Sequence, residues 1–258
     1  MPERPPRGKL RTDSTYDWRE IGEQVTAYTP LGPPPFSWTG CYFGGNVGGK
    51  WARTSGSVDI AATTGTTPTP ASSFPLAEDT TNTFVAGGQV GCDLHENHFL
   101  FGIEGEVDGQ QWSKTRIVTA PVPAQSALFN PGDTFKLSSS WEASLLGRIG
   151  FAWNRLLFYG NGGVAFTNMR LNSNFVASAI RGPAVGVSTN KELVGAAVGG
   201  GFEFGIWEHM SVGIEGRYIW YGRHSFDSIS VATAPVTTTV KLNTAEVLAK
   251  LNFRFGGY

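Results

Sequence analysis

The sequence predicts an all-β protein: an eight-stranded antiparallel transmembrane up-and-down β-barrel with short periplasmic turns and four long outer loops. Three observations predict it. Eight segments alternate apolar and polar residues at period two, one face of each segment is apolar while the other is polar or charged, and the links between segments alternate short and long. Bacterial transmembrane barrels combine an even strand number with this asymmetry of connections.

The last segment, residues 245–255, shows the alternation most clearly. Val247, Phe253 and Phe255 fall on one face, and Glu246 and Lys250 fall on the other. Seven further segments alternate in the same way, near residues 41–51, 84–90, 99–108, 141–153, 158–166, 192–204 and 210–221. Each apolar face implies a strand of about 9–11 residues, which is enough to cross a bilayer at a tilt.

The connections indicate how the segments pair. Links at 93–98, 154–155 and 205–209 have the length of hairpin turns. The other links, about 52–82, 113–136, 168–189 and 222–239, are long, polar and rich in Thr, Ser, Pro and Ala. If the strands are antiparallel neighbours, all four long links lie at one end of the barrel.

Charge and composition favour an inside-out protein. Only 16% of the residues are charged, the net charge is −1, and there is no apolar run long enough for a transmembrane helix. We therefore expect no nucleic-acid partner. A soluble sandwich or barrel would bury its apolar residues, whereas here the charges lie opposite the aromatic residues, and an eight-stranded barrel has an interior that side chains can fill. The predicted ion-pair network of the lumen comprises Glu104, Glu106, Arg148, Glu203, Glu215, Arg217, Glu246, Lys250 and Arg254.

The carboxylates of this network could act as catalytic acid–base pairs or as members of salt bridges. Glu104 with Glu106, or Glu203 with Glu215, could form acid–base pairs, but carboxylates beside basic residues in a narrow lumen are more simply salt-bridged. Arg148 is expected to pair with Glu104 or Glu106.

The register of the first hairpin predicts a disulfide. Pairing Phe43 with Val90 and Val47 with Ala86 keeps outward residues opposite outward residues. The same register places Cys41 opposite Cys92, and these are the two cysteines of the chain. Directly opposed strand residues have Cβ atoms about 4.5–5.5 Å apart, so a modest local adjustment would close the bond. The alternative is that Cys41 and Cys92 are two unlinked small apolar residues.

Several stretches resemble the small outer-membrane β-barrel, or porin-like surface antigen, family of alpha-proteobacteria. They are WTGCYFGGNVG at 38–48, GGQVG at 87–91, FGIEGE at 101–106, LFYGNGGVA at 157–165, GGGFE at 199–203, EGRY at 215–218 and LNFRF at 251–255. The resemblance implies an integral protein of the outer membrane of a Gram-negative cell, with a role in envelope integrity and surface contact and a fold like the membrane domain of outer-membrane protein A. It also implies contact with outer-membrane lipid and lipopolysaccharide, and delivery by the barrel-assembly machinery.

The chain departs from the family pattern at three places. Family members carry aromatic residues where Cys41 and Cys92 stand, an Arg near Leu146, and a chain end at or just after the residue matching Phe255. The predicted assembly signal is Phe253, Phe255 and Tyr258. Because Tyr258 is out of phase with the other two, we expect recognition to fall on Phe255.

The segment before the barrel is predicted to be separate from it. Residues 1–37 are rich in Pro and charge and lack the apolar core of a secretory signal, so we expect a disordered segment at 1–37 and a barrel at 38–258. Since an outer-membrane protein has to cross the inner membrane, either the start of the chain is wrongly assigned, or the N-terminal sequence is altered, or the family resemblance is misleading. We expect one of the first two.

The expected function is structural and not catalytic, with the lumen plugged by side chains and the protein monomeric. No nucleophile elbow, phosphate loop or metal-ligand spacing is visible, so we expect no cofactor and no metal. Two alternatives stay open, because some relatives act as narrow pores and others bind haemin. His224, near Tyr221 at the base of the last long link, is the histidine positioned to meet a surface ligand such as haemin.

Overall fold

Alternation of apolar and polar residues produces eight strands, because an extended chain places successive side chains on opposite faces. The computed structural model describes residues 36–60, 72–119, 131–177, 183–231 and 234–256, all within the compact unit Pro35–Tyr258. The strands are β1 Gly40–Ile60, β2 Ser72–Glu96, β3 Phe99–Ile117, β4 Thr134–Trp153, β5 Leu156–Phe175, β6 Val185–Trp207, β7 Met210–Val231 and β8 Ala234–Phe255. No helix in these ranges is long and apolar enough to cross a membrane.

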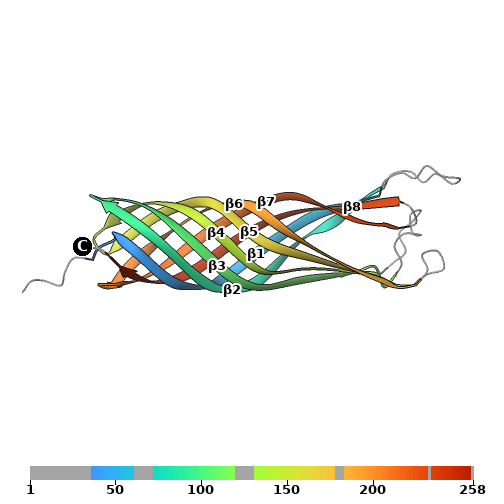
Figure 1. Ribbon diagram of the computed structural model, residues 1–258, viewed down its shortest axis with the longest axis horizontal. Helices are drawn as coiled ribbons and strands as arrows, with labels where there is room; N and C mark the ends of the chain where they lie inside the picture. The colour runs from blue at the N-terminus through green and yellow to red at the C-terminus, as the bar shows by residue number, and fades with distance from the viewer. Residues whose placement is uncertain (1–35, 61–71, 120–130, 178–182, 232–233, 257–258) are drawn as a thin grey trace, which may run out of the picture. The chain divides into compact units, whose positions relative to one another are not determined.

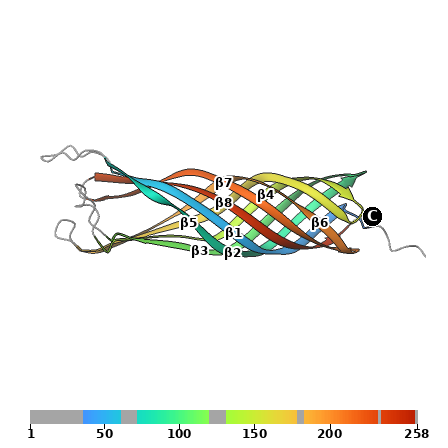
Figure 2. The same cartoon turned by 180° about the vertical axis from the view of Figure 1, so that it is seen from behind.

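The strands close into one barrel. Each strand pairs antiparallel with the next along the chain, and β8 pairs back with β1, as Figures 1 and 2 show from opposite sides. At the closing seam Cys41 lies opposite Phe255 and Phe43 opposite Phe253. Closure satisfies the backbone of every strand edge, which is what a chain needs in a bilayer that offers no water. The predicted fold class is confirmed.

The predicted register of the first hairpin is also correct. Phe43 lies opposite Val90 and Val47 opposite Ala86 in the β1–β2 ladder. The short turns fall within the predicted links, at residues 97–98, 154–155 and 208–209, and two of them are shorter than the predicted links 93–98 and 205–209. Asn97 and Asn154 open two of these turns with φ of 58° and 54°, a left-handed conformation that Asn tolerates better than most residues.

The strands are longer than the 9–11 residues expected, and the long links are correspondingly shorter. They run from 19 residues in β3 to 25 in β2. Most of the stretches 52–82, 168–189 and 222–239 is strand, and β7 and β8 are separated by residues 232–233 alone. In the stretch 113–136, the strands take in residues 113–117 and 134–136. The apolar face measures only the part of a strand that lies in lipid. Beyond it, Thr-rich stretches such as 80–83 and 237–239 keep the ladder, in keeping with the β propensity of Thr.

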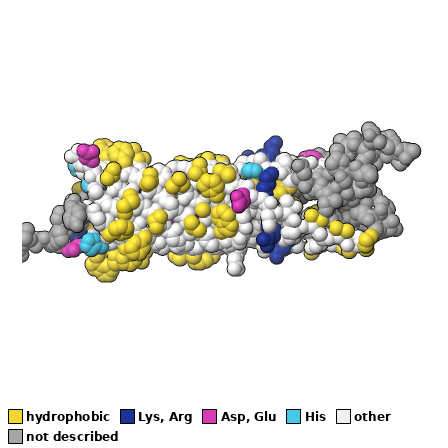
Figure 3. Space-filling model, viewed as in Figure 1, with side chains coloured by type: hydrophobic (Ala, Val, Ile, Leu, Met, Phe, Trp, Pro, Cys, Tyr) yellow, Lys and Arg dark blue, Asp and Glu magenta, His cyan; other side chains and the backbone are white. Residues whose placement is uncertain are grey.

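The two faces of the sheet separate by character. Val247 is 47% exposed on the outside of β8 whereas its neighbour Leu248 is fully buried inside. Apolar side chains cover the outer surface over the half of the barrel that carries the short turns (Figure 3). An outward apolar band with an inward polar face is the reverse of a soluble protein and is typical of a barrel that spans a membrane.

The described part of the chain begins slightly before the predicted boundary of the barrel. Phe36 and Ser37 are described with the barrel, two residues before the expected boundary, and the Phe36 ring lies 4.7 Å from that of Trp38 in an edge-on contact. The rest of the predicted N-terminal segment, residues 1–35, and Tyr258 of the predicted assembly signal lie outside the described residues.

Candidate functional site in the barrel lumen

Inward side chains fill the lumen in three successive layers. Nearest the short turns is a small apolar cluster of Trp38, Leu100, Ala152, Leu157 and Tyr159, with Phe36 packed against it. Charged residues and tyrosines follow in the middle. Toward the far end lies a larger apolar cluster that includes Trp112, Leu146, Met169, Leu193, Ile219 and Phe226. Leu146, which replaces the Arg expected from the family pattern, therefore extends the apolar layer and adds no charge.

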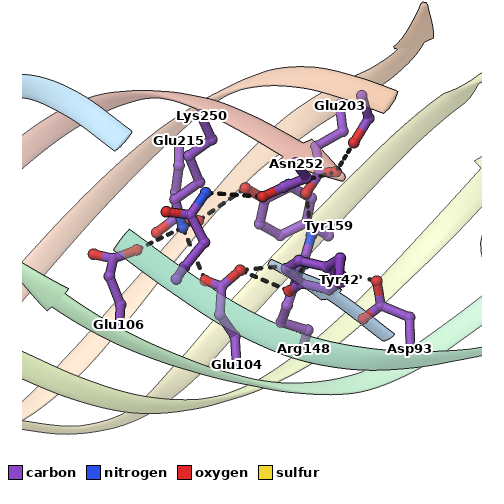
Figure 4. Close-up of polar contacts among 12 residues, drawn as sticks. Tyr42, Asp93, Glu104, Glu106, Arg148, Tyr159, Glu203, Glu215, Lys250 and Asn252 are labelled. Carbon is purple, nitrogen blue, oxygen red and sulfur yellow. Dashed lines mark hydrogen bonds and ion pairs between the residues drawn. The ribbon is translucent and has the colours of Figure 1, made fainter. Parts of the chain in front are cut away.

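Arg148 is the centre of the first group of charges. From β4, its Nη2 lies 2.5 Å from Oε1 of Glu203 on β6, and its Nη1 lies 3.4 Å from Oε2 of Glu104 on β3. The guanidinium also lies over the ring of Tyr159, with its Cζ 4.1 Å from the ring centre. Tyr42 donates a hydrogen bond of 2.7 Å to the same Oε2 of Glu104 and accepts one from Arg148 (Figure 4).

Of the two partners expected for Arg148, the structure shows Glu104. Glu104 pairs with it, but Glu106 does not, because Glu106 lies two residues farther along β3 and reaches Arg217 and Lys250. Asp93 of β2 also approaches Arg148, at 3.7 Å from its Nη1.

Arg254 connects the charged layer to the small apolar cluster nearest the short turns. Its Nη2 lies 3.0 Å from Oδ2 of Asp93 and 3.4 Å from Oε2 of Glu203. Its Nη1 donates to the carbonyl oxygen of Trp38 at 3.0 Å, and its guanidinium lies over the Trp38 ring at 4.6 Å. Trp38 in turn donates from its indole Nε1 to the carbonyl of Asn154 at 2.9 Å, so the segment before β1 is tied to a turn on the other side of the barrel.

Lys250 is the centre of the second group. Its Nζ lies 2.8 Å from Glu104 Oε1, 2.9 Å from Glu106 Oε2 and 2.7 Å from Glu215 Oε2. Tyr159 donates a further hydrogen bond of 2.8 Å to Glu215. Figure 4 shows these side chains converging from β3, β5, β7 and β8. One ammonium is therefore shared by three carboxylates that are buried from solvent.

The third group connects opposite walls of the barrel. Arg217 of β7 pairs with Glu106 of β3, and its Nη2 lies 3.2 Å from Oε2 of Glu246. Lys50 of β1 pairs with Glu142 of β4 and lies 2.7 Å from Glu246. Tyr221 donates a hydrogen bond of 2.5 Å to Glu142. Since β3 and β7 are four strands apart in either direction around the barrel, the Arg217–Glu106 pair crosses the full lumen.

The structure brings together all nine residues of the predicted network, each buried and each in at least one ion pair. The network also contains charged partners beyond the predicted set, namely Lys50, Asp93, Asp108 and Glu142. Lys50 and Glu142 fall on the polar faces of their segments, so the alternation itself could have identified them. The sequence predicts Asp93 in a turn, whereas the residue lies within β2 opposite Gly40.

His224 lies elsewhere than expected. It is in β7 opposite Val240 and not at the base of a loop, because β7 and β8 continue past this level. Its Nε2 lies 2.6 Å from the carbonyl oxygen of Tyr221, which places a proton on that nitrogen. The described part of the chain holds no group of three or more His, Cys, Asp or Glu residues arranged for a metal ion.

The cysteines and the terminal aromatic residues lie at the end with the short turns. Cys41 and Cys92 face each other across the β1–β2 ladder and are joined by a disulfide. Phe253 and Phe255 point outward from β8, and the Phe43 ring lies 5.7 Å from the first and 6.1 Å from the second.

A closed antiparallel barrel with an apolar outside and a charged inside defines a transmembrane β-barrel. Residues 36–255 match the family described as outer membrane protein beta-barrel domain, and the chain belongs to that family.

Two curated relatives come from Brucella. The 25 kDa outer-membrane immunogenic protein of Brucella abortus is 23% identical over 236 residues, covering 91% of this chain and 88% of the relative. The 31 kDa outer-membrane immunogenic protein of Brucella melitensis is 26% identical over 253 residues, covering 91% of each. Both the expected alpha-proteobacterial family and the outer-membrane location are thereby confirmed.

Among solved structures, the chain is similar to Ail, the attachment invasion locus protein of Yersinia pestis. Identity is 14%, the alignment covers 81% of this chain and 99% of Ail, and the TM-score is 0.31.

Proposed function

We propose that this protein is a non-catalytic structural barrel of the outer membrane, closed to solute flow by its lumen side chains, that supports envelope integrity and surface contacts. One observation carries the proposal: buried ion pairs connect opposite walls, as Arg217 of β7 does with Glu106 of β3. Breaking such a pair leaves an unpaired buried charge, which is strongly destabilising. The pairs therefore favour a lumen that stays packed.

The two apolar layers support the same proposal. Trp38 closes the lumen near the short turns with no exposed surface, and the cluster around Trp112 and Ile219 packs the other side of the charges. Open aqueous channels belong to larger barrels, whereas eight strands enclose little more than their own side chains. A narrow diffusion pore is the competing function.

Planar-bilayer recording of the folded, full-length chain separates the two functions. We expect no steady conductance from the wild type. The double variant Arg217→Ser/Glu106→Ser removes both members of the pair that spans the lumen and should open transiently. Lys136→Ser/Glu192→Ser is the matched control, because it also removes one cation and one carboxylate but from exposed positions on β4 and β6. A steady wild-type conductance would overturn the proposal in favour of the pore.

The remaining parts of the role are proposals of the same kind. We expect a monomer in contact with outer-membrane lipid and lipopolysaccharide, delivered by barrel-assembly machinery that reads Phe255. A hydrolase and acyltransferase screen on folded protein tests the non-catalytic part. Haemin binding through His224 stays a prediction, and haemin titration of the wild type against His224→Ala tests it.

A further inference from the structure

Two cations lie directly opposite each other on the outer surface of the barrel. Arg223 of β7 pairs in register with Lys241 of β8, and both side chains are exposed. We propose that this pair binds a phosphate group of the glycolipid in the outer leaflet, the lipid A part of lipopolysaccharide. The inference rests on the structural role proposed above and names the lipid site through which the barrel would be held in its leaflet.

A backbone irregularity brings the two cations together. Along β7 the residues 213, 215, 217, 219 and 221 point inward, so an undisturbed strand would also point residue 223 into the lumen. The ladder shifts between Trp220 and Gly222, and Gly222 has φ of +76°, a conformation that glycine adopts readily. Such a bulge adds one residue and reverses the faces beyond it. Arg223 consequently points outward, beside Lys241.

The arrangement is unfavourable unless an anion is present. Like charges directly opposite in a sheet destabilise it, because their Cβ atoms are about 4.5–5.5 Å apart. Among the residues described, no carboxylate lies within ion-pair distance of Arg223 or Lys241. Arg53 of β1 adds a third outward cation nearby, since it lies opposite Asn243, two residues from Lys241 along β8. An external anion between Arg223 and Lys241 would remove the repulsion.

The height of the cluster favours a lipid phosphate over a soluble anion. Trp220, 46% exposed, is the last large outward side chain of β7 before Arg223, and Trp51, 43% exposed, precedes Arg53 by two residues on β1. Aromatic residues of this kind sit at the level of the lipid headgroups. Figure 3 shows Lys and Arg side chains gathered in a narrow band just beyond the apolar surface, on the side away from the short turns. Long basic side chains at this level reach the headgroup region directly.

The test measures binding of lipid A to the folded, full-length protein in detergent micelles. Native mass spectrometry follows a titration with bisphosphorylated lipid A, and a parallel titration uses lipid A from which the phosphates have been removed. For Arg223→Gln/Lys241→Gln we expect affinity for the phosphorylated lipid to fall about 25-fold, which is about fivefold for each cation at an anionic lipid surface. Affinity for the dephosphorylated lipid should be weak and equal in the two proteins.

Lys136→Gln/Arg170→Gln is the matched control, since it removes two exposed outward cations from β4 and β5 that do not oppose another cation. Loss of affinity in this control as large as in the test variant would overturn the site. So would equal binding of the wild type and the test variant, or binding of lipid A that does not depend on its phosphates. Soluble dextran sulfate is added as a competitor. If it displaces bound lipid A and the protein shows no preference for lipid A over dextran sulfate, the site binds soluble polyanions, and the lipid assignment is overturned.

Two further controls keep the result interpretable. Heat-modifiable gel mobility shows that each variant is folded, and Lys241→Gln alone serves if the double variant does not fold. Bilayer conductance is measured separately from lipid affinity. A conducting wild type that still binds lipid A through Arg223 and Lys241 would overturn the closed lumen and leave this site standing.

Discussion

Lys250 Nζ lies 2.7 Å from Oε2 of Glu215 on the neighbouring strand, two residues from direct register, since Glu215 lies opposite Leu248 and Lys250 opposite Gly213. The same ammonium reaches Glu104 and Glu106 on β3, on the other side of β1 and β2. One side chain of β8 thereby connects a neighbouring strand to a distant wall. The lumen is held by such shared cations more than by isolated pairs.

Lys250→Met should consequently destabilise the barrel by about 3–5 kcal/mol, because three buried carboxylates lose the cation they share. Urea unfolding in detergent or in lipid vesicles measures the change. Lys136→Met, at an exposed position on β4, is the control and should stay within about 0.5 kcal/mol of wild type. Equal midpoints for the two variants would contradict the network.

The lipid face can be tested at two adjacent residues. Val247 points outward and Leu248 inward. We expect Val247→Arg to cost about 2–4 kcal/mol if it lies near the bilayer midplane, and the cost should change with lipid thickness. Leu248→Arg places a charge among packed lumen side chains, so its cost should not depend on thickness. A thickness dependence at 248 and none at 247 would mean that the faces are reversed.

The faces and the first register could be predicted from the sequence because both depend on local alternation. Val247 and Leu248 follow from period two alone, and the opposition of Cys41 and Cys92 follows from keeping apolar residues on one side of a hairpin. The order of the strands followed from the lengths of their links.

What could not be predicted depends on closure of the barrel. The partners of Arg217 and Lys50 lie on opposite walls, and the tilt and stagger of the closed sheet decide which side chains meet there. The outward direction of Arg223 depends on the bulge at Gly222, which interrupts the alternation. The length of the strands beyond the lipid also has no signal in an outward apolar face, because stretches such as 237–239 carry polar residues there, while Phe226 and Val240 stay buried inside.

A pH-dependent contact lies beyond the apolar band, where Asp79 of β2 meets Lys114 of β3. A hydrogen bond from Lys114, aided by its charge and by Arg116 with Nη2 at 3.2 Å, lowers the pKa of Asp79. A carboxylate whose pKa is lower in the folded state stabilises the fold above its unfolded pKa of about 3.9, and this contribution is lost as the pH falls through the lower folded value. In Lys114→Met the pKa of Asp79 should rise toward 3.9. Carbon-detected NMR titration of the carboxyl measures it, and an unchanged pKa would show that Lys114 is not its partner in solution.

The last prediction concerns the disulfide between Cys41 and Cys92. The bond spans 51 residues of sequence and links the start of β1 to the β2 residue opposite it. The periplasm is oxidising, so protein from cell envelopes, denatured without reductant, should show no reactive thiol. Because the crosslink restricts the unfolded chain, Cys41→Ser/Cys92→Ser should lower the free energy of unfolding by about 2–4 kcal/mol. Reduction of the wild type should lower it similarly while leaving the double Ser variant unchanged, which separates loss of the bond from loss of the sulfur atoms. Two reactive thiols per chain in unreduced protein would show that the bond does not form in the cell.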